Sequence, residues 1–426
     1  MILRTRDIIE QIRHGNVPDG YKKTKAGILP ADWDMYILGD CLCRVERPVE
    51  INPNELYTQI GIRSHGKGIF YKEPVTGAAL GNKSVFWIEP DCFIVNIVFA
   101  WEQAIGKTTQ SEVGMIGSHR FSMYRPVNDR VDVDYLISYF LTKRGTDILE
   151  AASPGGAGRN KTLGQERFLK SKIILPPIEE QRKIAAILAT QDKVIELKEK
   201  RLAEKQKQKK YLIQQLLTGK KRLPGFSEEW KIKPLNKLTE KQKKKNSGFQ
   251  YHLVLSNSAQ HGIVSQDQEF DKEIANEERI DGYYIVLPGA FVYNPRISVT
   301  APCGPINVNE TGETGIMSPL YTVFTISSPQ ISQDFLKYYF QSSCWYKYVK
   351  GVANYGARHD RISISDGDFF DMPIPLPTKE EQSYIAKVLS ASNREIELLQ
   401  QDIEQEKQKK KALMQLLLTG IVRVKI

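Results

Sequence analysis

The sequence lacks several features that mark membrane proteins and many enzymes. None of its apolar runs approaches the length of about 18 residues that a membrane span requires. It holds 5 cysteines, an odd number spread over 426 residues, which favours reduced thiols in a cytoplasm over a disulfide framework. Its 6 histidines show no spacing typical of metal ligands. We therefore expect no metal-binding residues.

Catalytic motifs are equally scarce. No Walker-type phosphate loop is present, because the string Gly66-Lys67-Gly68 does not match one. The string nearest to a DNA methyltransferase motif, Asn294-Pro295-Arg296, lacks the second proline and the aromatic residue. Glu196-Leu197-Lys198 resembles the end of a nuclease motif, but its neighbours predict a helix. We therefore expect no catalytic residues and no cofactor bound by this chain.

Basic residues exceed acidic ones. The formal net charge is +10 and the sequence pI is about 9.1. Such an excess favours polyanionic partners, either nucleic acid or an anionic membrane surface. Lysine-rich surface helices would explain the same charge without any such partner.

A long internal repeat is the main signal. With an offset of 201 positions, residues 175–219 align with residues 376–420, and 19 of these 45 positions are identical. Both copies contain Leu-Pro, then Glu-Glu-Gln, and end on Leu-Leu-Thr-Gly. Weaker matches extend upstream with offsets that fall to 194. A period near 200 residues indicates two copies of a domain followed by a helix.

The well-matched end of each copy predicts a helix of about 40 residues, which is about 60 Å long. Pro176-Pro177 favours a helix start directly afterwards, and Gly219 and Gly420 favour helix ends. One apolar stripe runs along each helix: Ile184, Leu188, Ile195, Leu202, Leu212 and Leu216, then Ile385, Leu389, Ile396, Ile403, Leu413 and Leu417. We expect the two helices to pair as an antiparallel coiled coil within the chain, although pairing with another subunit would also cover the stripes.

The segments between the helices predict two α+β domains that are mostly β. Short runs rich in β-branched and aromatic residues alternate with glycine and proline, and short helices are expected at residues 134–149 and 333–349. The expected organisation is an N-terminal arm (1–25), a first domain (26–175), a first helix (176–219), a second domain (220–376), a second helix (377–420), and a tail (421–426) that docks near the first domain. The fold is then a tandem repeat with pseudo-two-fold symmetry.

Three loops in each domain carry side chains suited to nucleic acid. Base readout uses arginine, asparagine, glutamine and serine, whereas phosphate contacts use arginine, lysine and backbone amides. The loops recur at corresponding positions of the two copies, although solvated loop residues would look the same one at a time. The candidate DNA-binding residues are Arg63, Ser64, Lys67, Lys107, Arg159, Asn160 and Lys161 in the first copy, and Asn257, Gln260, Arg296, Arg358 and Arg361 in the second.

The order of these parts resembles the specificity subunit of type I restriction-modification systems. The resemblance covers nearly the whole chain and rests on Ile174-Leu175-Pro176-Pro177-Ile178-Glu179-Glu180-Gln181, on Ile374-Pro375-Leu376-Pro377 with Glu380-Glu381-Gln382, and on both Leu-Leu-Thr-Gly ends. It implies two target recognition domains that each read one half of a split, asymmetric DNA site, with the helices as a spacer between them.

The resemblance also implies partners. Two modification methylase subunits would bring S-adenosylmethionine and methylate adenine, and ATP-powered restriction subunits would cleave double-stranded DNA. Two other readings of the sequence stay open: a coiled-coil scaffold without a DNA role, and a self-sufficient methyltransferase-nuclease, against which the missing cofactor loop argues.

Overall fold

The computed structural model describes residues 2–25, 27–155, 161–266, 277–354 and 360–424. The chain forms two compact units: unit 1 contains Met1–Glu199 and Asp402–Ile426, and unit 2 contains Lys200–Gln401. Each unit holds one globular domain and one half of each long helix. This division differs from the sequence-based boundaries, because each half-helix packs its apolar residues into the core of its own unit. In the part of the chain that the structure describes, no helix has the length and apolar content of a membrane span.

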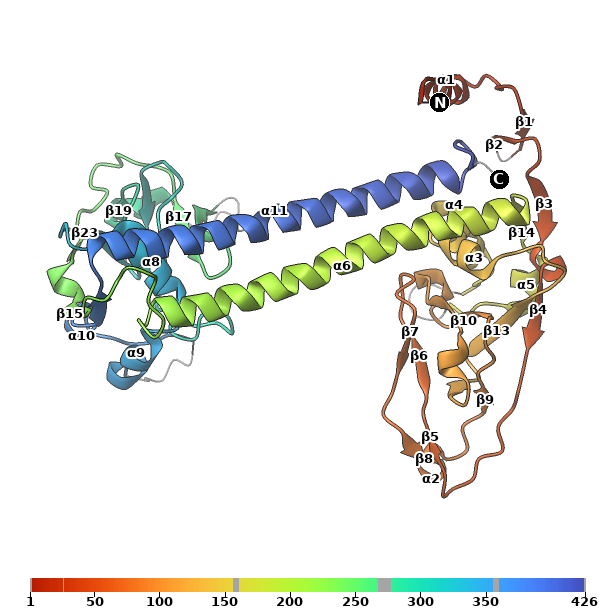
Figure 1. The fold of residues 1–426 in the computed structure, drawn as a ribbon, viewed down its shortest axis with the longest axis horizontal. Coiled ribbons are helices and arrows are strands. Elements are labelled where there is room, and N and C mark those ends of the chain that lie inside the picture. The colour runs from red at the N-terminus through yellow and green to blue at the C-terminus, as the bar shows by residue number, and fades with distance from the viewer. Residues whose placement is uncertain (1, 26, 156–160, 267–276, 355–359, 425–426) are drawn as a thin grey trace. The chain divides into compact units, whose positions relative to one another are not determined.

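Unit 1 is built on a four-stranded antiparallel sheet of order β11-β10-β13-β4 (Figure 1). The strands are Ile105–Lys107, Phe93–Asn96, Phe121–Pro126 and Leu42–Val45. Helices α3 (Val133–Phe140) and α4 (Lys143–Ala151) supply core residues beside this sheet, together with α5 (Gln165–Lys170). Thr142 separates α3 from α4, because its side chain accepts a hydrogen bond from the Gly145 amide and begins a new helix. The single helix expected at 134–149 is therefore two.

Strand pairs extend unit 1 around that sheet. They are β1–β2 (Tyr21–Thr24, Gly27–Pro30), β3–β14 (Asp34–Ile37, Lys172–Leu175), β5–β8 (Leu56–Tyr57, Val75–Thr76), β6–β7 (Ile60–Ile62, Ile69–Tyr71) and β9–β12 (Val85–Trp87, Ile116–Ser118). The remaining helical elements are α1 (Ile2–Arg13), α2 (Gly77–Leu80) and the 3-10 helices η1 (Leu38–Asp40), η2 (Ala100–Glu102) and η3 (Gln110–Glu112).

Unit 2 repeats the plan. Its four-stranded sheet has the order β21-β20-β23-β16, with strands Ile306–Val308, Phe291–Tyr293, Thr322–Ile326 and Thr239–Lys241. Its pairs are β15–β24 (Lys231–Pro234, Pro373–Leu376), β17–β18 (Leu255–Ser258, Gly262–Ser265) and β19–β22 (Tyr284–Val286, Gly315–Met317). Its helical elements are α8 (Gln333–Gln341), α9 (Tyr346–Val352), α10 (Asp366–Phe370), η4 (Leu235–Lys237) and η5 (Glu277–Gly282). Sheet order and flanking helices match those of unit 1, so the sequence repeat is also a repeat of fold.

The two long helices are α6 (Ile178–Leu216) and α11 (Lys379–Leu417), each 39 residues long. Within unit 1, Asp192 of α6 pairs with Lys410 of α11, and Lys198 pairs with Asp402. The helices are antiparallel there, because a higher number on α6 meets a lower number on α11. Within unit 2, Leu216 lies in one core cluster with Ile385 of α11, which gives the same antiparallel sense. The expected antiparallel helix pair is confirmed (Figure 1).

Ion pairs cross the polar middle of the seam. In unit 1, Lys198 donates to Asp402 at 2.8 Å and to Glu406 at 2.9 Å. Hydrogen bonds from Gln191 and Lys198 lower the pKa of Glu406 to about 2. In unit 2, Lys205 pairs with Glu395 at 2.8 Å. The polar interruptions of the apolar stripes therefore join the helices by charge where apolar packing is thin.

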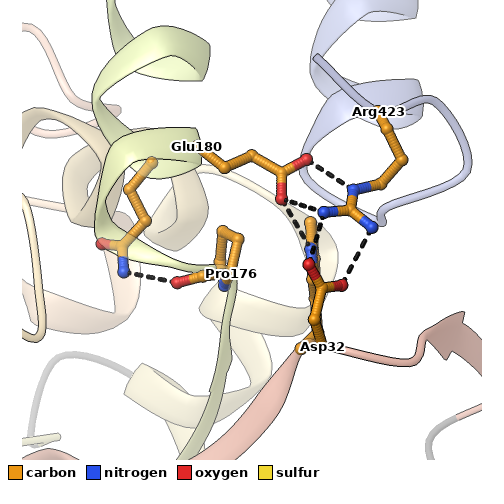
Figure 2. Close-up of polar contacts among 6 residues, drawn as sticks. Asp32, Pro176, Glu180 and Arg423 are labelled. Carbon is orange, nitrogen blue, oxygen red and sulfur yellow. Dashed lines mark hydrogen bonds and ion pairs between the residues drawn. The ribbon is translucent and has the colours of Figure 1, made fainter. Parts of the chain in front are cut away.

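A buried carboxylate anchors the first turn of α6. The side chain of Glu180 is fully buried and accepts hydrogen bonds from the Trp33 indole at 3.1 Å and from Arg423 Nε and Nη2, both at 2.7 Å. Arg423 also forms a bidentate pair with Asp32 at 2.8 and 2.9 Å (Figure 2). These bonds hold the pKa of Arg423 above its usual value. The residues after α11 are thereby fixed to the residues before β3.

The neighbouring glutamine joins the start of α6 to the start of α3. Gln181 Nε2 donates to the carbonyl oxygens of Pro176 and Arg130, both at 2.9 Å. Its Oε1 accepts from the Asp132 amide, also at 2.9 Å. Asp132 is itself the N-cap of α3, so one buried amide group satisfies backbone polar groups that would otherwise lack partners.

Unit 2 contains the same anchor. Glu381 is fully buried and accepts two hydrogen bonds from Arg222, both at 2.7 Å, and one from the Trp230 indole at 2.9 Å. Gln382 donates to the carbonyl oxygens of Pro377 and Gln330 and accepts from the Ser332 amide. Arg222 and Arg423 stand at the repeat offset of 201. Each follows its helix by the same number of residues.

Replacing the buried carboxylate should destabilise unit 1. We predict that Glu180→Gln lowers the free energy of unfolding by about 3 kcal/mol, because Arg423 and Trp33 lose a charged acceptor inside the fold. Urea unfolding followed by circular dichroism measures the change. Glu179→Gln is the matched control: its side chain is exposed, and a change of less than about 0.5 kcal/mol is expected. Equal effects of both substitutions would contradict the anchoring role of Glu180.

Candidate nucleic-acid interface

The first candidate loop of unit 1 connects β6 to β7 and is held in a fixed shape. Ser64 Oγ donates to a carboxylate oxygen of Glu102 at 2.9 Å. The backbone amides of His65 and Gly66 donate to the carbonyl oxygens of Glu102 and Gln103 at 2.8 and 2.9 Å. The first loop is therefore bonded directly to the second, which begins at Gln103.

The two cationic side chains of this loop, Arg63 and Lys67, differ in their contacts. The Arg63 guanidinium lies 4.8 Å from the centre of the Phe70 ring, which orients it without removing its charge. Lys67 is exposed. Among the residues that the structure describes, Lys67 has no ion-pair partner, so the loop presents an oriented arginine and an unpaired lysine to solvent.

The polar side chains of the second loop, Gln103 and Lys107, bond to other residues of unit 1. Gln103 Nε2 donates to Thr146 Oγ1 at 2.5 Å, which turns this side chain inward. Lys107 pairs with Asp134 at 2.7 Å. Burial lowers the pKa of Lys107, but the hydrogen bond and charge of Asp134 outweigh it and hold that pKa above its usual value. Lys107 stays a predicted DNA-binding residue, and its charge is paired with that of Asp134 in the fold.

Lys161, at the end of the third loop of unit 1, lies beside the other two loops. Arg159 and Asn160 lie outside the described residues. Lys161 is described, and its Nζ lies 5.3 Å from the centre of the Trp101 ring. Trp101 belongs to η2, directly before Gln103. The described parts of the three loops that sequence comparison selected separately therefore lie at one place in unit 1.

In unit 2 the first loop is the turn between β17 and β18. Asn257 is only 2% exposed, and its Nδ2 donates to the carbonyl oxygens of Val292 and Pro305 at 2.7 and 3.3 Å. Its side chain holds the fold together and is not available to a base, so its assignment as a DNA-binding residue is corrected. Gln260, at the turn itself, is exposed.

The second and third loops of unit 2 are also joined. Arg296 and Arg361 form a backbone bridge, and the Asp360 carboxylate lies 4.0 Å from one guanidinium and 3.8 Å from the other. The Arg296 side chain is 65% exposed, whereas that of Arg361 is 29% exposed. Arg358 lies outside the described residues. Sequence inspection missed Asp360, because a residue's type alone does not reveal which cation it faces.

A polar groove runs between the first two loops of unit 2. Its volume is about 340 Å³. Among its lining residues are Ser256, Ser258, Asn294, Arg296, Ser298 and Tyr321. Hydroxyl, amide and guanidinium groups of this kind read base edges and bind phosphate oxygens. Among the described residues, no group of three His, Cys, Asp or Glu side chains is placed to hold a metal ion.

Comparison with known proteins agrees with this arrangement. The family described as "Type I restriction modification DNA specificity domain" matches residues 89–207. Two proteins of Methanocaldococcus jannaschii, named as the MjaX and MjaVIII type I restriction enzyme specificity subunits, are each 24% identical to the chain, over 96% of it and 97% of their own length. The chain is similar to type I restriction-modification specificity subunits over nearly its whole length. These relatives are named for specificity and not for a catalytic activity.

Solved structures match the chain over most of its length. A HsdS subunit from Thermoanaerobacter tengcongensis has a TM-score of 0.53 at 18% identity, with 92% of this chain and 98% of that one covered. A chain from a study of complex assembly and conformational transition of the type I restriction-modification system has a TM-score of 0.59 at 18% identity, with 92% and 99% covered. At this level of identity the likeness concerns the fold.

Removing an exposed cation from the loop set should alter the salt dependence of DNA binding by the chain. We predict that Lys67→Ala reduces the slope of log K against log salt concentration by about 0.9, because one phosphate contact is lost. Fluorescence anisotropy at several salt concentrations measures the slope. Lys83→Ala removes an exposed lysine from the turn between α2 and β9 and should leave the slope unchanged. An unaltered slope for Lys67→Ala would remove that residue from the interface.

Proposed function

We propose that the chain reads an asymmetric, two-part DNA site and directs adenine methylation and DNA cleavage by partner subunits. One observation carries the proposal: the described parts of the same three loops meet in each unit, but these loops carry different side chains. The first loop is Arg-Ser-His-Gly-Lys at residues 63–67 and Asn-Ser-Ala-Gln-His at residues 257–261. Equivalent surfaces with different donors and acceptors would read different half-sites.

The proposal assigns the chemistry to other chains. Two modification methylase subunits would bind S-adenosylmethionine, flip an adenine out of the duplex and methylate it. Restriction subunits using ATP and magnesium would cleave. This chain would bind neither cofactor and would contribute sequence recognition. Its net charge of +10 fits attraction to a DNA polyanion.

Exposed leucines support docking of two like partners. Leu197 of α6 is 57% exposed and Leu398 of α11 is 47% exposed. They stand at the repeat offset of 201, one in each unit. The two leucines therefore mark equivalent places on the two helices. Equivalent leucines on the two helices fit one copy of the same partner on each, as two methylase subunits require.

Leucine replacement tests this docking. We predict that Leu197→Glu combined with Leu398→Glu lowers the affinity for the methylase at least tenfold, because each charge would lose hydration in an apolar interface. Size-exclusion chromatography with light scattering measures the assembly. Each single variant should bind one methylase instead of two. Lys200→Glu, a change at an exposed position on the same helix, serves as the control, and a loss of assembly equal to that of the double variant would contradict specific docking.

The spacer role can be tested separately. We predict that one additional heptad in both α6 and α11, inserted at equivalent positions, widens the unread gap of the DNA site by up to about three base pairs, because the helices lengthen by about 10 Å. Sequencing of methylated DNA reports both half-sites and the gap. The half-site sequences should stay the same, so altered half-sites or an unchanged gap would contradict the spacer role.

A further inference from the structure

A polar cavity in unit 2 lies where the long helices meet the globular domain. Its volume is about 640 Å³. Helix α6 contributes Lys209, α11 contributes Asn393 and Glu397, α8 contributes Lys337, and the turn between β17 and β18 supplies its exposed Gln260. The same turn borders the groove of the candidate DNA surface, because Ala259 lines both hollows. The cavity therefore lies between the candidate DNA surface of unit 2 and the long helices.

One cation of this cavity is not neutralised. Glu310 pairs with Lys337 at 2.5 Å, and Glu397 pairs with Arg394 at 3.7 Å. Lys209 forms no ion pair with any residue that the structure describes. Burial lowers the pKa of Lys209, and the more distant charge of Glu397 opposes that effect. A partly buried ammonium group without a counter-ion is costly unless an anion joins it.

In unit 1 the equivalent lysine has an acidic partner. Lys410 is the counterpart of Lys209 at the repeat offset of 201, and it pairs with Asp192 at 2.5 Å. The counterpart of Asp192 in unit 2 is Asn393. The lysine is therefore kept in both copies, but its carboxylate partner is replaced by a neutral amide in unit 2 alone.

The amide itself is incompletely bonded. Asn393 Nδ2 donates to the Tyr338 hydroxyl at 3.4 Å. Asn393 Oδ1 is buried and accepts no hydrogen bond from any residue in the described ranges. An unpaired ammonium group and an unpaired amide oxygen thus line one cavity. Neither is explained by packing within unit 2.

We propose that this cavity receives a phosphate of the bound DNA, held by Lys209, so that unit 2 contacts the DNA backbone with its spacer helix as well as its loops. The inference rests on the proposed DNA-reading function. A phosphate supplies the missing negative charge, and an ammonium group is a compact donor to its oxygens. The shared turn at residues 259–262 places the cavity beside the loops that would contact the same strand. In unit 1, Asp192 occupies that role, so the contact belongs to unit 2 only.

Charge substitutions at two positions test the inference. We expect Lys209→Gln to reduce the slope of log K against log salt concentration by about 0.9 in DNA binding by the full chain, alone and assembled with the methylase. Asn393→Asp should reduce the slope similarly without removing the lysine, because it recreates the pair seen in unit 1. Lys410→Gln removes the same charge from the equivalent place and should leave the slope unchanged.

The possible outcomes separate this inference from the proposed function. An unchanged slope for Lys209→Gln and Asn393→Asp, with a reduced slope for Lys67→Ala, would overturn the phosphate site while DNA reading stands. Loss of methylase assembly with an unchanged DNA slope would overturn it in favour of an acidic side chain of the partner. Failure of every form of the chain to bind DNA would contradict the proposed function itself.

Discussion

A buried carboxylate at the start of each long helix is the interaction on which the architecture depends. Glu180 and Glu381 each accept hydrogen bonds from a tryptophan and from an arginine beyond the end of the other long helix in the same unit. Both units thus use the same pairing of a buried carboxylate with a guanidinium group. In unit 2 the arginine, Arg222, lies on the segment that leads into the domain, and in unit 1 it is Arg423, which comes from the C-terminal end of the sequence.

This requirement explains why the repeat can be detected in the sequence. The Glu-Glu-Gln strings, the prolines before them and the glycines after Leu-Leu-Thr are fixed by buried hydrogen bonds and by helix ends, and both helices begin and end within a few residues of their expected limits. Other features depend on contacts that no local pattern encodes. Thr142 divides the helix expected at 134–149 in two. The compact units cut across the long helices because half of each apolar stripe packs into each core.

The sequence predicted where the candidate DNA surface lies better than which side chains belong to it. The loops recur at matching places, and their described parts meet within each unit, because the repeated sheet brings the same strand ends together. Residue type, however, says nothing about burial or charge partners. Asn257 looks like a base reader but bonds backbone carbonyls inside the fold, and Lys107 pairs with Asp134. Conversely, Lys209 resembles an ordinary helix lysine. Only its counterpart Lys410 shows that, among the described residues, Lys209 lacks the acidic partner found in unit 1.

The account's central claim is that this chain decides which sequence its partners modify. Mapping methylated adenines across the genome of a host that carries the whole system, with and without this chain, tests the claim most directly. Methylation should fall at one asymmetric motif made of two short half-sites with an unread gap, and it should disappear when the chain is deleted. Methylation that persists without the chain, or that lies in a single uninterrupted motif, would contradict the account.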